Sequence, residues 1–217
     1  MKNVRHFPRL IAEMKINEVT SKIEAHSNEI VASLTQRDVQ FYQFIKNESK
    51  QTNVAENLIF QFVYSNFYTL DNRKLTPEFK LEYFRIMEEL KSSDTIDIEK
   101  ILFKLHDIPL RGSFKFHFSF ASKLAHTLDE NVPIWDSQIA KMFSFKRPAG
   151  DDWEKIADDF VDQIENIQTA YETIITNNLL VNTLKAFDDK FKGNEISTHK
   201  KIDFIFWASG KLSLHNH

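Results

Sequence analysis

Residues 113–143 read SFKFHFSFASKLAHTLDENVPIWDSQIAKMF, and this stretch carries the strongest fold signal in the chain. Four phenylalanines alternate with other residues at its start: Phe114, Phe116, Phe118 and Phe120. Four apolar residues also recur at every fourth position: Phe116, Phe120, Leu124 and Leu128. Alternation is typical of a strand, whereas spacing by four is typical of a helix. We favour a helix through 113–128, because the spacing by four continues past the alternating part. A turn containing Pro133 and a second helix after Asp136 follow.

The rest of the chain predicts further helices joined by short loops. Amphipathic spacing indicates one helix over residues 9–34. Capping residues mark further helix starts, namely Thr35 with Asp38, Asn53 with Glu56, Thr76-Pro77, Asp97, Asp136, Asp151 or Asp152, and Ser197. Gly210 is a candidate helix terminator. The chain has 20 Phe but only 4 Gly and 5 Pro, which argues against a turn-rich β-sandwich. We therefore expect an all-α fold of about ten helices in one compact body.

Composition excludes several classes of site. The 217 residues include no cysteine, so disulfides, thiolate zinc sites and cysteine nucleophiles are excluded. The chain has no glycine-rich phosphate loop, no GxSxG elbow and no HExxH motif. Its histidines are scattered, and His215 and His217 are expected to be solvated, so we expect no metal site and no cofactor. No apolar run resembles a signal peptide or reaches the roughly 20 residues of a membrane span, so we expect a cytoplasmic protein.

One pair of residues stands out as candidate chemistry. Lys123 lies within a hydrophobic predicted helix, and Asp136 lies at the start of the next helix. Because the chain reverses between them, both side chains are expected to face one cleft. Partial desolvation would make the Lys123 amine a candidate nucleophile. The N-terminus of a helix would keep Asp136 ionised and lower its pKa, which suits stabilisation of a cationic transition state.

Simpler interpretations of the same residues remain open. Asp136 could be a helix cap and nothing more, because capping is a common role of aspartate at helix starts. Lys123 could extend its ammonium group to solvent. Trp135 fits either a core residue or a ring that stacks on a flipped-out base. Trp207 and Lys211 are interpreted as packing and as a helix-end charge.

Lys123 followed by Pro133-Ile134-Trp135-Asp136 resembles the active-site segment of the helix-hairpin-helix DNA glycosylases, which include the 8-oxoguanine and adenine glycosylases. The likeness is strongest over residues 119–143. It implies that Lys123 is the nucleophile that attacks the sugar and that Asp136 stabilises the oxocarbenium-like state. It also implies DNA as the partner and two helical lobes, formed by 1–50 with 151–217 and by 51–150. Other segments, including 201–207, resemble a small bacterial family with no firm activity.

Basic residues near this segment are the expected nucleic-acid contacts. With Trp135, they are Arg111, Lys115, Lys141, Lys146 and Arg147. The formal net charge of −3 is opposite in sign to that of most nucleic-acid binders. The family's hairpin reads Leu-Pro-Gly-Val-Gly, whereas residues 108–113 here read IPLRGS, and the interval from lysine to aspartate is shorter here. These departures favour the alternative of a non-catalytic helical interaction module with the same fold. A weaker third alternative is an assembly protein that uses residues 9–34 as its interface.

Overall fold

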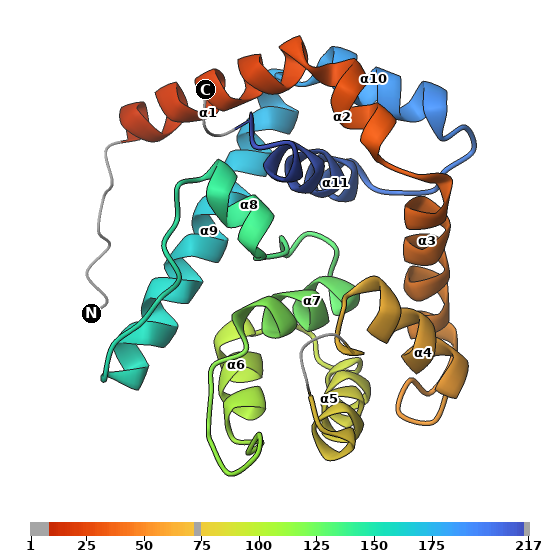
Figure 1. Ribbon diagram of the computed structural model, residues 1–217, viewed down its shortest axis with the longest axis vertical. Helices are drawn as coiled ribbons and strands as arrows, with labels where there is room; N and C mark the ends of the chain where they lie inside the picture. Colours follow the sequence, from red (N-terminus) through yellow and green to blue (C-terminus); the bar gives the residue numbers. More distant parts are fainter. Residues whose placement is uncertain (1–8, 72–74, 215–217) are drawn as a thin grey trace.

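The computed structural model describes residues 9–71 and 75–214, and over these residues the chain is all-α (Figure 1). Eleven helices are present in the described part: α1 (Arg9–Ala25), α2 (Ser27–Ser33), α3 (Gln36–Gln51), α4 (Leu58–Phe67), α5 (Pro77–Leu90), α6 (Ile98–His106), α7 (Phe118–Leu128), α8 (Ser137–Met142), α9 (Trp153–Asn177), α10 (Val181–Lys190) and α11 (Thr198–Lys211). The predicted all-α fold is confirmed. His215 and His217 lie outside the described residues.

Most of the predicted helix starts are confirmed, because their caps are local. A side-chain oxygen accepts a backbone N–H of the first turn at each of these residues: Thr35, Thr76, Asp97, Asp136, Asp152 and Ser197. At Thr35 the capping box with Asp38 is complete in both directions. Each cap satisfies backbone donors that have no partner within the helix. These helices therefore begin where the sequence predicted.

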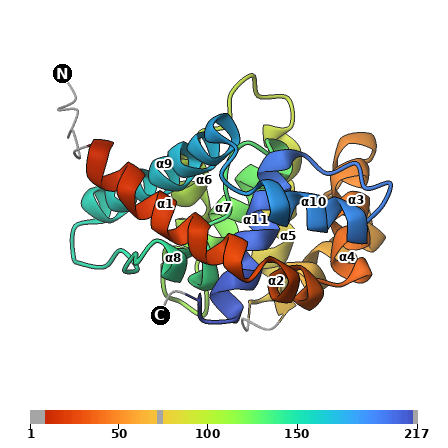
Figure 2. The same ribbon diagram turned by 90° about the horizontal axis from the view of Figure 1, so that it is seen from above.

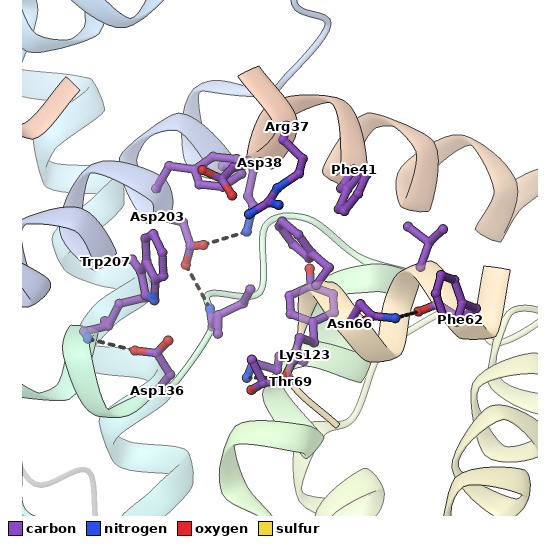
Figure 3. A pocket seen from close by; sticks show the side chains of 17 residues that line it. Arg37, Asp38, Phe41, Phe62, Asn66, Thr69, Lys123, Asp136, Asp203 and Trp207 are labelled. Atoms are coloured by element: carbon purple, nitrogen blue, oxygen red, sulfur yellow. Dashed lines mark hydrogen bonds and ion pairs between the residues drawn. The ribbon is translucent and has the colours of Figure 1, made fainter. Parts of the chain in front are cut away.

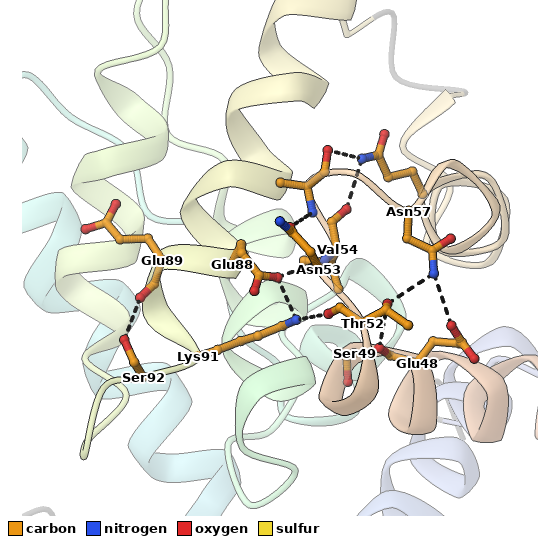
Figure 4. A network of polar contacts seen from close by, with 12 residues as sticks. Glu48, Ser49, Thr52, Asn53, Val54, Asn57, Glu88, Glu89, Lys91 and Ser92 are labelled. Atoms are coloured by element: carbon orange, nitrogen blue, oxygen red, sulfur yellow. Dashed lines mark hydrogen bonds and ion pairs between the residues drawn. The ribbon is translucent and has the colours of Figure 1, made fainter.

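The predicted start at Asn53 is wrong, and α4 begins five residues later. The Asn53 side chain accepts the Ala55 N–H instead, and Asn57 caps the helix through Phe60 N. Figure 4 shows the network that fixes this loop: Glu88 of α5 accepts the Val54 N–H at 2.8 Å and pairs with Lys91, which donates to the Thr52 carbonyl. The contact with α5 lies far along the chain, so no local pattern could predict it.

The predicted single helix over 9–34 is also wrong, because it is broken at His26. The His26 backbone has φ −112° and ψ 18°, and α2 starts at the next residue. The two pieces pack differently: α1 contacts α9 and α10, whereas α2 contacts α10 and α11. Figures 1 and 2 show α1 lying across one end of the molecule, over α9. Packing on two separate surfaces accounts for the break.

Residues 114–117 are not helical, so the prediction of a helix through 113–128 is only partly right. Helix α7 starts at Phe118 and runs to Leu128. Before it, Leu110 and Ser113 exchange backbone hydrogen bonds across a tight turn, in which Arg111 and Gly112 have φ of 54° and 76°. Two successive positive φ values are typical of a type I′ turn. The alternating phenylalanines thus lie on both sides of the boundary between a non-helical segment and a helix.

Only the second half of the phenylalanine-rich run lies in the core, because Phe114 is exposed and Phe116 is partly exposed. Phe118 is buried, and its ring centroid lies 5.0 Å from that of Phe160 in α9. Phe120 is buried as well, and its carbonyl accepts a hydrogen bond from the Tyr83 hydroxyl at 3.0 Å. None of the four phenylalanines of the run lines the main cavity. They join α7 to α5, α6 and α9.

Two elements cross the predicted boundary between lobes. Helix α3 packs on α4 and α7, and α8 packs on α11. Figure 1 shows α7 in the middle of the molecule, between the α4–α6 group and the helices that surround α11. The two-lobe arrangement of the DNA glycosylases stays a prediction. Among the described helices, none combines the length and apolar character that a membrane crossing requires.

Candidate functional site

A cavity of about 530 Å³ lies where α3, α4, α7 and α11 meet the start of α8. Six charged residues line it: Arg37, Asp38, Lys123, Asp136, Lys200 and Asp203. Six aromatic residues also line it: Phe41, Phe62, Phe67, Tyr68, Phe204 and Trp207. Figure 3 shows Trp207 and Asp203 on one side and Phe41 and Phe62 on the other. The volume is within the range of small-molecule pockets, about 300–1,000 Å³.

Lys123 is buried in this cavity, with 8% of its surface exposed. Its Nζ donates to the Tyr68 carbonyl at 3.2 Å and lies 5.6 Å and 5.8 Å from the ring centroids of Tyr68 and Phe120. An ammonium group over aromatic faces is stabilised by the ring quadrupoles. The interpretation that Lys123 extends its ammonium group to solvent is therefore wrong, because the residue is buried.

Asp136 lines the same cavity from the first position before α8. Its Oδ1 accepts the Gln138 N–H at 2.8 Å and the Ile139 N–H at 3.0 Å. The expectation of a lowered pKa is wrong: burial raises the pKa of Asp136 above its ordinary value. The backbone N–H of Ile139, the Lys123 ammonium and the Gln138 N–H lower it, and the Asp203 carboxylate raises it further. Desolvation outweighs the hydrogen bonds of the cap.

The segment that carries Asp136 is held from two helices. The Trp135 N–H donates to Ser122 Oγ of α7 at 3.0 Å, and Ser122 Oγ donates in turn to the Trp135 carbonyl at 3.2 Å. The Ile134 N–H donates to Asp203 Oδ1 of α11 at 3.4 Å. Ser122 is fully buried, so water does not compete for these bonds. The backbone before Asp136 is thus fixed on both sides.

Lys200 and Asp203 form a buried ion pair in the cavity wall. Their Nζ–Oδ2 distance is 2.7 Å, and only 2% and 4% of the two residues are exposed. Lys200 Nζ also lies 4.7 Å from the ring centroids of both Tyr42 and Phe204. A buried charge pair of this kind requires close geometry and further polar partners, because desolvation costs several kcal/mol per ion. The geometry is close, Asp203 has a further polar partner in the Ile134 N–H, and Lys200 has the two rings.

Trp135 lies in the core and does not line the cavity. Its indole Nε1 donates to Gln163 of α9 at 2.7 Å, and its ring contacts Phe118 and Phe160. With 6% of its surface exposed, Trp135 has no face available for a base. The interpretation as a core residue is the one that fits.

The predicted basic residues lie on the surface and do not line the cavity. All five are exposed: Arg111, Lys115, Lys141, Lys146 and Arg147. Arg147 Nη2 donates to the Phe116 carbonyl at 3.1 Å, and its guanidinium lies 4.9 Å from the centroid of the Phe118 ring. Their proximity in the sequence therefore does not produce a basic rim on the cavity.

The sequence analysis missed Arg37, Lys200 and Asp203, and it interpreted Trp207 as packing. Trp207 is partly exposed in the cavity, and Lys211 Nζ lies 4.3 Å from its ring centroid. A signal was present: Lys200 and Asp203 are three residues apart in a segment that is otherwise rich in aromatic residues. Charged residues one turn apart on an apolar helix indicate a buried pair.

No group of three or more histidine or carboxylate residues within 9–71 and 75–214 is arranged to hold a metal ion. The three cationic and three anionic residues of the cavity balance, which suits an uncharged ligand with hydrogen-bonding groups. Comparisons with protein-family models, with curated proteins and with solved structures returned no match for this chain.

Proposed function

We propose that the protein is a DNA-repair-like N-glycosylase that cleaves the bond between a damaged base and its sugar in DNA. One observation carries the proposal: Lys123 and Asp136, singled out from the sequence as a catalytic pair, line the same cavity from different elements. Lys123 is buried beside aromatic rings and Asp136 is partly buried, and electrostatic interactions are stronger where water is partly excluded. A flat, uncharged base matches the aromatic walls and the balanced charges.

Asp136 is the group proposed to assist the departure of the base. Its carboxylate stabilises positive charge that develops on the sugar, and it accepts a proton from the water that attacks C1′ as the C1′–N bond breaks. The base leaves with the electron pair of that bond and takes up a proton from solvent. The raised pKa of Asp136 brings it closer to neutral pH, which favours its action as a general base. Lys123 is the candidate nucleophile for a second route, in which its amine attacks C1′ and a covalent Schiff base forms with the opened sugar.

A base-release assay tests the proposal. Duplexes that each carry one damaged base are incubated with the protein, and the free base is quantified. Asp136→Asn is expected to lower the rate by about 10²–10⁴-fold, the usual contribution of a general acid or base. Asp152→Asn is the matched control, because Asp152 caps α9 in the same way outside the cavity. No base release by the unmodified protein from any lesion tested would contradict the proposal.

Borohydride trapping tests the role of Lys123 separately. Reduction should fix a covalent adduct with DNA in the unmodified protein and in the surface variant Lys141→Ala. The adduct should be absent in Lys123→Ala. If base is released but no adduct forms, the enzyme is a glycosylase without lyase activity, and Lys123 is not a nucleophile.

The exposed face of α4 favours the second candidate, a non-catalytic interaction module. Leu58, Ile59 and Phe62 are 75%, 68% and 69% exposed, and clustered apolar exposure of this kind is typical of contact surfaces. Under this alternative the protein releases no base, and the triple variant Leu58→Ser/Ile59→Ser/Phe62→Ser keeps its helical circular dichroism. The base-release assay therefore separates the glycosylase from the interaction module.

A further inference from the structure

The ion pair of Lys200 and Asp203 is unusual for a helix that otherwise packs through apolar residues. Residues 202–206 of α11, which include Asp203, are all buried. Trp207 follows them and is partly exposed in the cavity. Replacing a buried pair with apolar residues is often neutral or stabilising. A pair that lines a cavity therefore points to a role in that cavity, beyond the stability of the fold.

We infer that Asp203, held in place by Lys200, is a positioning residue for Asp136. Asp203 Oδ1 accepts the N–H of Ile134, two residues before Asp136, and this contact fixes the strand-like approach to α8. Asp203 Oδ2 is occupied by Lys200 at 2.7 Å, so the carboxylate has one orientation. The inference rests on the proposed function in that Asp136 acts as the general base.

The charge of Asp203 has a second effect on Asp136. The groups that face or act on Asp136 come from several helices: Arg37 and Asp38 of α3, Lys123 of α7, Tyr171 of α9, and Lys200 and Asp203 of α11. Among them, Asp203 raises the pKa of Asp136, whereas Lys123 lowers it. Like charges in one site disfavour the ionisation of each other. Asp203 thus acts against the effect of Lys123 and keeps the pKa of Asp136 closer to neutral pH.

The test follows the titration of the Asp136 carboxyl carbon by NMR in the full-length protein. In Asp203→Asn the midpoint for Asp136 should move to lower pH, and the acidic limb of the base-release profile should move in the same direction. Glu130→Gln is the matched control, because Glu130 is a partly buried carboxylate with bonds to Tyr42 and Ser197 outside the cavity. Its variant should leave the Asp136 midpoint unchanged.

Asp203→Asn leaves Lys200 as a buried cation without its carboxylate partner, so this variant risks unfolding. The double variant Lys200→Gln/Asp203→Asn removes both charges and keeps two groups able to hydrogen bond, and the midpoint should again fall. An unchanged midpoint in a folded variant overturns the inference. If the midpoint falls but no lesion is processed, the proposed function fails, and the effect of Asp203 on the pKa of Asp136 stands without it. If base is released and the midpoint does not move, the inference alone fails.

Discussion

Asp136 has two opposite effects on the stability of the folded protein. As a helix cap it accepts two backbone N–H groups, which stabilises α8. As a partly buried carboxylate it is desolvated, and its pKa rises. Groups with shifted pKa values are common at functional sites, and such sites often lower the stability of the folded protein.

Asp136→Asn is expected to stabilise the protein at neutral pH while lowering the rate of base release. A carboxyl group whose pKa is raised in the folded state favours folding most below its unfolded value of 3.8, and that advantage is lost as pH rises through the folded pKa. Asparagine caps helices about as well as aspartate and carries no charge. Urea unfolding at pH 4 and pH 7 should show the variant gaining on the unmodified protein as the pH rises.

The control for this prediction is Asp152→Asn, which changes an exposed cap of the same type. It should show no comparable gain. A variant at position 136 that is less stable than the unmodified protein at pH 7 would mean that the cap depends on the ionised form.

The sequence predicted two of the six charged residues of the cavity, and the reason is clear. A single reversal of the chain, at the turn that contains Pro133, separates Lys123 from Asp136 and suffices to bring both to one cavity. Lys200 and Asp203 reach it only because α11 packs on α8, a contact between distant parts of the chain. The basic residues around positions 111–147 are close in sequence, but they lie on surfaces that do not border the cavity. The sequence therefore predicted local neighbours well and distant ones poorly.

At the scale of helices, the contact between α11 and α8 positions the start of α8. It depends on Gly210, which the sequence suggested as a helix terminator and which instead lies inside α11. A Cβ at position 210 would lie 2.3 Å from the Gln138 carbonyl oxygen. Glycine is used here for close approach of two backbones, a use that sequence patterns do not distinguish from helix termination.

Gly210→Ala is expected to destabilise the protein by about 1–3 kcal/mol or more, because the Gln138 backbone would have to move. Since Gln138 is two residues after Asp136, base release should fall as well. Ser209→Ala, at the neighbouring buried position, removes only a hydroxyl that bonds within its own helix and should change stability little. Thermal unfolding of both variants measures the difference. Equal melting temperatures would show that α8 can shift at low cost.

At the scale of the whole molecule, the cavity joins parts of the chain from Arg37 to Trp207. Its walls come from α3 and α4 on one side and from α11 on the other, with α7 between them. The geometry of the site therefore depends on global folding and on the conditions that maintain it. Protonation of desolvated histidines is one such condition, because α7 carries the buried His126 and is preceded by the partly buried His117.

The stability of the folded protein should fall as pH decreases from about 6.5 toward 4. Burial lowers the pKa of His117 from 6.5 to about 4, and the positive charges of Arg147 and Lys115 lower it further. Burial also lowers the pKa of His126. The unfolded chain therefore binds protons that the folded chain does not, and the stability present above pH 6.5 is lost as the pH falls. For His117 the full loss corresponds to about 3 kcal/mol.

His117→Gln should flatten this dependence, because the variant has one fewer group that is protonated only on unfolding. The His117 ring packs 4.7 Å from Phe79, so some stability is lost at every pH. The difference in slope between the variant and the unmodified protein from pH 6.5 to 4 reports the proton bound by His117. Urea unfolding across this range gives the slope. His26→Gln, at an exposed position, is the control and should follow the unmodified protein. Parallel curves for His117→Gln and the unmodified protein would mean that His117 is protonated in the fold, and acid sensitivity would then arise from His126.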